Sequence, residues 1–191
     1  MTEPRSMIDL LRARTATHHH GLERDLRIED RLSGVDTRGP LIDGYNAFYS
    51  ECEAALWPHL WYISDLTFFS RFRSRKIPGK TELAGSRNPL ADLAFPAVGT
   101  KAEALGAMYV LEGSTLGGKV ILKTLRSKGV STSEFHFLDP YGKDAGALWR
   151  VFLSVLERET APDRAAMNEC VLGATNAFAF AAACLAEQRT N

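Results

Sequence analysis

The chain has 191 residues, which is enough for one hydrophobic core, so we expect a single domain over residues 1–191. Lys plus Arg number 23 and Asp plus Glu number 23, so the formal net charge is zero, which argues against a nucleic-acid-binding protein. No uninterrupted apolar run approaches the roughly 20 residues that span a bilayer, and residues 1–5 lack a signal-peptide pattern. We therefore expect a cytoplasmic protein that binds no membrane. The 3 cysteines are far apart and form no CxxC pair, which excludes a disulfide framework and a structural zinc site.

The spacing of apolar residues is helical along most of the chain. Stripes at intervals of three and four residues predict helices over 6–26, 41–63, 103–126, 146–157 and 163–187. Ser33-Gly34 and Gly39-Pro40 form the predicted break between the first two helices, while 75–100 and 127–142 are predicted to hold short helices and turns. Because strand signals are scarce, we expect an all-α, single-domain bundle of about six to eight helices.

Three of the 5 histidines stand together in the first predicted helix, at His18, His19 and His20. At roughly 100° per residue, His18 and His19 flank the centre of the apolar stripe and His20 points to solvent. The periodicity therefore turns His18 or His19 inward without choosing between them. Glu23 favours His19, because a carboxylate four residues on can orient an imidazole whose other nitrogen binds a metal. The alternative is that these are ordinary surface or core histidines.

A second unusual stretch lies in the helix predicted over 103–126. Gly113, Gly117 and Gly118 interrupt it, although each glycine costs roughly 1 kcal/mol relative to alanine inside a helix. Gly113 and Gly117 share a face, and Ser114 and Thr115 add hydroxyls beside it. Such a pattern predicts that the backbone closely approaches a ligand; the alternative is a close helix–helix crossing. The glycines and the lysine that follows them do not match a phosphate-binding loop.

Together the two stretches predict a ligand-binding slot. An inward histidine opposite a glycine-lined helix offers one strong iron ligand and one open face. A flat iron macrocycle needs this arrangement if O2 is to bind on its far side.

These motifs, in this order, resemble those of the haem oxygenase family, most closely the bacterial enzymes that accompany bacteriophytochromes. The stretch from Leu11 through His19 to Glu23 is similar to the family's N-terminal motif, whose histidine is the axial ligand, so the resemblance selects His19. Residues 109–118, YVLEGSTLGG, are similar to the distal helix of that branch. The similarity continues at Tyr141, Gly142, Gly146, Trp149, Phe152, Ala174 and Phe178.

The resemblance implies a haem-oxygenase-like fold and an enzyme that uses O2 to cleave haem to biliverdin, CO and Fe(II). Haem would be both cofactor and substrate, a ferredoxin or a reductase would donate the electrons, and a bacteriophytochrome is a candidate acceptor of the biliverdin. On the proximal side, the implied residues are His19 as the iron ligand, Glu23 to orient it and Arg12 to pair with a propionate. The other implied haem contacts are Tyr109, Gly113, Gly117, Gly118 and Phe178. The implied catalytic set, which shapes the distal face and anchors proton-carrying water, is Gly113, Ser114, Thr115 and Gly117.

One departure from the family pattern concerns proton delivery. Mammalian enzymes carry an Asp next to the first distal glycine, where this chain has Ser114. The neighbouring carboxylate, Glu112, is predicted to point about 100° away from Gly113 around the helix. A haem-binding or sensor protein that kept the slot without efficient turnover is therefore the main alternative. A thiaminase-like hydrolase or a di-iron carboxylate protein on a helical scaffold is a third interpretation, but it requires a reactive cysteine or a Glu-x-x-His ligand pair.

Overall fold

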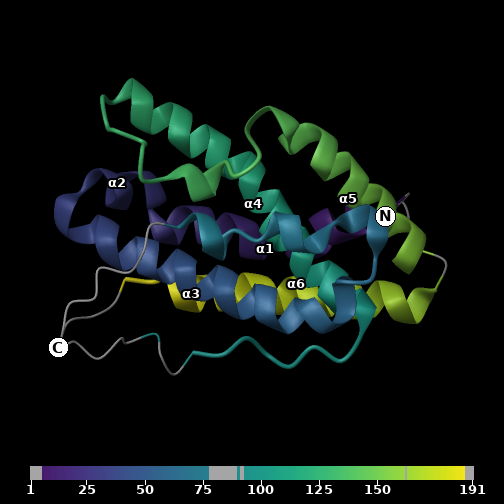
Figure 1. Ribbon diagram of the computed structural model, residues 1–191. Helices are drawn as coiled ribbons and strands as arrows, with labels where there is room; N and C mark the ends of the chain where they lie inside the picture. Colours follow the sequence, from purple (N-terminus) through teal and green to yellow (C-terminus); the bar gives the residue numbers. More distant parts are fainter. Residues whose placement is uncertain (1–5, 78–89, 91–92, 162, 188–191) are drawn as a thin grey trace.

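The computed structural model describes residues 6–77, 90, 93–161 and 163–187. These residues form helices and no strand, so the prediction of an all-α fold is confirmed (Figure 1). The α-helices are α1 (Met7–Leu26), α2 (Ile28–Ser33), α3 (Val35–Leu60), α4 (Lys101–Ser127), α5 (Ala145–Thr160) and α6 (Arg164–Leu185). Short 3₁₀ helices lie at η1 (Ser64–Leu66), η2 (Phe68–Arg71), η3 (Ser74–Lys76), η4 (His136–Leu138) and η5 (Gly142–Asp144).

Side-chain caps fix where three of the long helices begin. The side chains of Ser6, Thr100 and Asp163 accept hydrogen bonds from backbone N–H groups in the first turns of α1, α4 and α6. Such caps satisfy donors that a helix cannot pair internally. The positions of these caps agree closely with the predicted starts of the same helices.

The predicted break at Gly39-Pro40 is wrong, because α3 begins at Val35 and runs through both residues. The other predicted break is correct, since Gly34 is extended and precedes the first residue of α3. Proline disfavours a helical residue before it partly by clashing with that residue's Cβ, and Gly39 has no Cβ. Pro40 is the sixth residue of α3; its fixed φ suits a helix, and its missing N–H removes one backbone hydrogen bond. Of the predicted turn region 75–100, residues 78–89, 91 and 92 lie outside the described residues.

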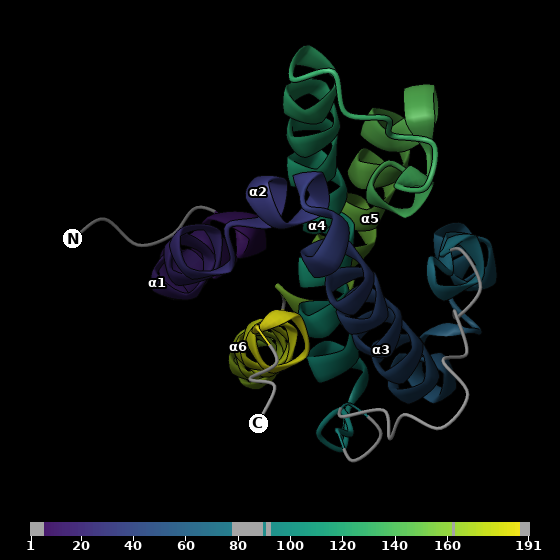
Figure 2. The ribbon, with the colours of Figure 1, turned by 90° about the vertical axis from the view of Figure 1, so that its left-hand side faces the viewer.

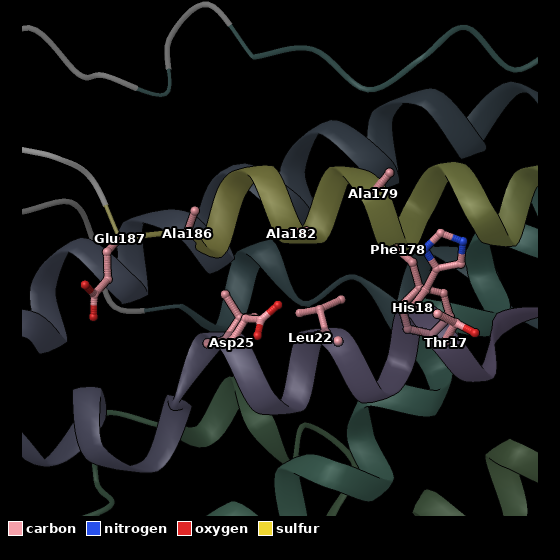
Figure 3. A pocket seen from close by; sticks show the side chains of 11 residues that line it. Thr17, His18, Leu22, Asp25, Phe178, Ala179, Ala182, Ala186 and Glu187 are labelled. Atoms are coloured by element: carbon pink, nitrogen blue, oxygen red, sulfur yellow. The ribbon is translucent and has the colours of Figure 1, made fainter.

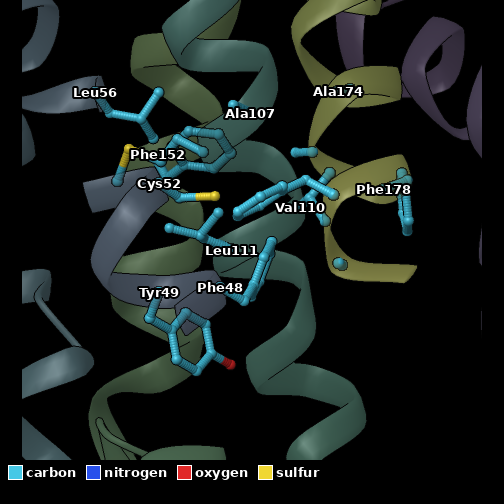
Figure 4. Close-up of a cluster of buried hydrophobic side chains, with 14 of the residues drawn as sticks. Phe48, Tyr49, Cys52, Leu56, Ala107, Val110, Leu111, Phe152, Ala174 and Phe178 are labelled. Carbon is cyan, nitrogen blue, oxygen red and sulfur yellow. The ribbon is translucent and has the colours of Figure 1, made fainter. Parts of the chain in front are cut away.

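α4 packs against α6, α3 and α5, whereas α1 packs mainly on α6. In Figure 1, α1, α4 and α6 run from right to left and α3 runs in the opposite direction; Figure 2 shows α4 central, with α1, α6 and α3 around it. Figure 4 shows side chains of α3, α4 and α6 meeting in the core, among them Cys52, Leu111 and Ala174. All three cysteines are buried with free thiols.

Two glycines allow α4 and α6 to cross closely. A Cβ added to Gly106 would overlap the carbonyl of Cys170, and one added to Gly173 would overlap the carbonyl of Glu103. The close crossing of α4 and α6 therefore lies at Gly106 and Gly173. Gly106 precedes Gly113 by about two helical turns. This packing leaves the role of Gly113 and Gly117 to be explained separately.

We expect Gly173→Ala to lower the free energy of unfolding by about 1–3 kcal/mol, because the added methyl group forces two backbones apart. Thermal or urea unfolding measures the effect. Gly146→Ala in α5 is the matched control: its new Cβ meets no atom within 4 Å, so stability should be unchanged or slightly higher. Equal stability of the two variants would contradict the close crossing.

α6 is long and apolar enough to cross a membrane by length and composition alone. Half of its most apolar window is buried inside the bundle, against α4, α1 and α3. A core helix of a bundle has this same character, and the packing of α6 accounts for its composition.

Candidate functional site

The three histidines of α1 have different surroundings. His19 Nδ1 lies 3.4 Å from Glu23 Oε2, and 56% of the His19 side chain is exposed. The rings of His18 and His19 lie 6.3 and 6.0 Å from the ring of Phe178 on α6. The structure therefore brings together the predicted ligand, its predicted orienting carboxylate and the predicted Phe178 contact. It leaves the rest of the His19 imidazole accessible.

Tyr109 of α4 lies against α1 one turn before these histidines. Burial raises the pKa of the Tyr109 hydroxyl, while a hydrogen bond with Thr15 and the charge of Arg12 oppose the rise. Thr15 is buried, and its own hydroxyl donates to the carbonyl of Leu11 at 2.8 Å. Since Arg12 and Thr15 precede His19 by seven and four residues, all three project from one side of α1. The side of α4 that carries Tyr109 is thus the side that faces α1.

One turn after Tyr109, that side of α4 is open. We call Gly113, Leu116, Gly117 and Val120 the open face of α4. A Cβ added to Gly113 or Gly117 would meet no atom within 4 Å, and Leu116 and Val120 are 45% and 62% exposed. Residues at intervals of three and four share a helix face with Tyr109, so the open face lies on the α1 side. Gly113 and Gly117 make no close helix crossing among the described residues, and this favours the ligand interpretation of their lack of side chains.

A cavity of about 410 Å³ lies between α1 and α6, on the other flank of α1. Figure 3 shows His18 and Leu22 of α1 facing Phe178 and Ala182 of α6 across it. Asp25 and Glu187 add carboxylates at one end. His18 therefore lines the cavity. His19 is not among the lining residues and lies on the side of α1 that carries Arg12 and Thr15.

Behind the open face, a buried arginine joins α3 and α4. Arg73 is 1% exposed; its Nη1 donates to Ser114 Oγ and its Nη2 to Thr115 Oγ1, each at 2.6 Å. Tyr49 Oη of α3 lies 3.4 Å from Arg73 Nη1 and 3.3 Å from Ser114 Oγ. We call Tyr49, Arg73, Ser114 and Thr115 the Arg73 cluster. Ser114 is half-buried, so this residue connects the buried guanidinium to the edge of the open face.

A curated protein named Heme oxygenase, from Xanthomonas campestris pv. campestris (strain 8004), is 31% identical to this chain over 116 residues. The match covers 60% of this chain and 69% of the relative. The chain belongs to the haem oxygenase family. No protein-family model and no solved structure matches the chain. The structure supplies the helical bundle that the family resemblance implied, with the histidine helix and the glycine helix meeting at Tyr109.

Gly118 differs from the other two distal glycines of this haem oxygenase family member. A Cβ on Gly118 would overlap the carbonyl of Leu138 in η4, so its lack of a side chain serves helix packing. The Cα–Hα direction that a side chain would take at Gly118 points away from the open face. Packing on Leu138 thus explains the glycine at this position, and its contact with haem stays a prediction.

The two predicted distal hydroxyls are held inside the protein. Ser114 Oγ accepts from Arg73 and donates to the Leu111 carbonyl at 2.8 Å. Thr115 is 2% exposed and lies on the buried side of α4. Of the two, only Ser114 is near enough to the open face to organise water there.

Glu112 faces away from the open face, as its spacing predicts. It is buried, and its carboxylate accepts hydrogen bonds from Arg71 Nη1 at 3.0 Å and from the Tyr141 hydroxyl at 2.8 Å. Arg71 also donates to the carbonyls of Leu66 and Leu148, so it ties η1 and α5 to α4. This ion pair is a structural connection.

The described part of the chain holds no group of three or more His, Cys, Asp or Glu side chains placed to bind a metal ion. The di-iron interpretation therefore finds no ligand set there. Sequence reasoning did not single out Arg73. Its only signal is the alternation of arginine with aromatic residues in 68–75, and a basic surface loop has the same pattern.

Proposed function

We propose that the protein is a haem oxygenase that uses O2 to cleave haem to biliverdin, CO and Fe(II). One observation carries the proposal: beyond the contact of Tyr109 with Thr15, α1 offers His19 and α4 offers an open, glycine-lined face. A planar ligand between them would meet an imidazole on one side and backbone on the other. Family membership makes haem the expected ligand.

The residues of α1 fit the iron side of haem. With Nδ1 of His19 directed at Glu23, the neutral tautomer that carries its proton on Nδ1 leaves Nε2 free to bind iron. Arg12 lies on the same side of α1, where its guanidinium can pair with a propionate. When bound, haem supplies the iron that holds O2 and the ring that is cleaved.

The residues of α4 fit the opposite side. Gly113 and Gly117 leave room for a small gas molecule, and the exposed side chains of Leu116 and Val120 provide apolar contacts for the macrocycle. An apolar wall beside that space would exclude bulk water from the reacting ring. Ser114 contributes the hydroxyl at the edge of this wall.

The electron donor that we propose is a ferredoxin or a reductase, as the family resemblance implies. The likeness of residues 109–118 to the bacteriophytochrome-associated enzymes supports a bacteriophytochrome as acceptor of the biliverdin. Both proposals place the protein in the cytoplasm.

Titration with hemin, followed by reduction with ascorbate, tests the proposed function. We expect a sharp Soret band that saturates at one equivalent and a single turnover that ends in free biliverdin. A Soret band that persists without biliverdin would favour the alternative, a haem-binding or sensor protein. The internal hydrogen bonds of Ser114 are the observation that favours that alternative.

Gly117→Ala is expected to slow biliverdin formation while leaving hemin affinity almost unchanged. A displacement of about 1 Å at a reacting centre costs on the order of 100-fold in rate, and the new methyl group occupies the space beside the ring. Single-turnover absorbance measures the rate. Gly118→Ala gives the contrasting result: its methyl group overlaps the Leu138 carbonyl, so the melting temperature should fall. Equal losses of hemin affinity and rate in Gly117→Ala would assign that glycine to packing.

A further inference from the structure

We propose that Arg73 is a positioning residue for the distal side, holding the Ser114 and Thr115 hydroxyls and placing a fixed positive charge behind the open face. The inference rests on the proposed function. Ser114 stands at the position where mammalian haem oxygenases have an Asp. We infer that its hydroxyl, together with the Arg73 guanidinium behind it, takes over the role of that carboxylate.

The side-chain hydrogen bonds of Arg73 converge on one short stretch of α4 and on Tyr49. Both Nη atoms donate to successive hydroxyls at 2.6 Å, which uses the rigid fork of the guanidinium. The guanidinium carbon lies 5.2 Å from the Tyr49 ring centroid and 5.7 Å from that of Tyr141. Aromatic rings and hydroxyls therefore enclose the cation on several sides.

Arg73 shares its nearest carboxylate with Arg71. The nearest carboxylate, Glu112, lies 3.8 Å from Arg73 Nη2 but 3.0 Å from Arg71 Nη1, so it pairs primarily with Arg71. Burial opposes the charge of Arg73, yet Tyr49, Glu112 and Tyr141 raise its pKa above the ordinary value. The side chain thus stays protonated, and part of its field extends through Ser114 towards the open face.

The direction of the Ser114 hydroxyl follows from this contact. Because Ser114 Oγ accepts from Arg73, its proton is directed to the Leu111 carbonyl. The side chain is thereby held in one rotamer, next to Gly113. Without Arg73, Ser114 keeps its contacts with Tyr49 and the Leu111 carbonyl but loses the contact that joins its hydroxyl to a fixed positive charge.

Arg71 is a matched comparison two residues earlier. It is equally buried and pairs with the same Glu112, but its other bonds go to backbone carbonyls of Leu66 and Leu148. Replacing either arginine removes a buried cation and costs stability. Of the two arginines, Arg73 alone contacts the hydroxyls beside Gly113.

The test compares Arg73→Met and Arg73→Lys with Arg71→Met in the hemin-loaded protein. The main measurement is the C–O stretching frequency after reduction and addition of CO, because positive charge near the oxygen of CO lowers this frequency. We expect a higher frequency in Arg73→Met than in wild type and Arg71→Met, with partial restoration in Arg73→Lys. Biliverdin formation should fall by about 10- to 100-fold in Arg73→Met, the scale of losing one positioned group. Hemin affinity should stay within a few-fold of wild type, because His19 is unchanged.

The outcomes separate the two proposals. If wild type fails to bind hemin or to form biliverdin, the proposed function is wrong, whatever Arg73 does. If wild type forms biliverdin but Arg73→Met and Arg71→Met have the same C–O frequency, Arg73 has only a structural role. Should Arg73→Met not fold, the test compares the effect of Arg73→Lys on the C–O frequency in wild type and in Ser114→Ala. If Arg73 acts through Ser114, Arg73→Lys causes no further shift of the C–O frequency in Ser114→Ala. A shift as large as in the wild-type background would contradict this.

Discussion

His19→Ala is expected to abolish axial ligation of the haem iron and, with it, biliverdin formation. The imidazole is the proposed ligand on the proximal side, its Nδ1 faces Glu23 at 3.4 Å, and the rest of the ring is accessible. Absorption spectra of the ferric and the ferrous CO forms measure the loss. Added imidazole should restore a histidine-like spectrum, because a small ligand can enter the space that the side chain leaves.

The two neighbouring histidines are controls for the register of α1. His20→Ala should leave the spectra unchanged, because His20 points away from the apolar stripe. His18→Ala should also keep the axial ligand, although His18 stacks on Phe178 and lines the cavity beside α6. A His19→Ala spectrum identical to that of wild type, together with loss of ligation in His18→Ala, would make His18 the ligand. It would also move the haem towards the α1–α6 cavity.

The helices could be predicted because their determinants are local. Apolar spacing and capping residues lie within a few positions of the structure they specify. The predicted bounds of α1, α4 and α6 therefore agree closely with the observed ones. The predicted start of α3 after Gly39-Pro40 is wrong, because the fixed φ of Pro40 is helical and the glycine before it removes the Cβ clash. General breaker rules do not contain this exception.

The candidate site could be predicted only where one helix carries the pattern. His19 with Glu23 and Gly113 with Gly117 are pairs at an interval of four residues, so the sequence indicates that each pair shares a face. Arg73 is brought to α4 by packing of a segment some 40 residues earlier in the chain, and nothing local shows that an arginine is buried. Gly118 shows the converse limit: sequence cannot distinguish a glycine that faces a ligand from one that packs on Leu138.

Ser114→Ala is expected to slow ring cleavage by about 10- to 100-fold, the scale of losing one positioned proton carrier. Ser114 is the half-buried member of the Arg73 cluster and adjoins Gly113, so its hydroxyl is the group best placed to anchor water on the distal side. Single-turnover biliverdin formation, measured together with released hydrogen peroxide, records the effect. Hemin affinity and the ferric spectrum should hardly change, because the proximal side is intact.

Glu112→Gln separates proton delivery from stability. Glu112 accepts from Arg71 and Tyr141 on the buried side of α4, so its replacement should lower the melting temperature by leaving a buried cation without its partner. Since its carboxylate faces away from Gly113, the rate of ring cleavage in the folded protein should change little. A normal rate in Ser114→Ala with a severe loss in folded Glu112→Gln would contradict the water relay and make Glu112 the proton donor. The opposite result would show that a serine held by Arg73 does the work of the mammalian aspartate.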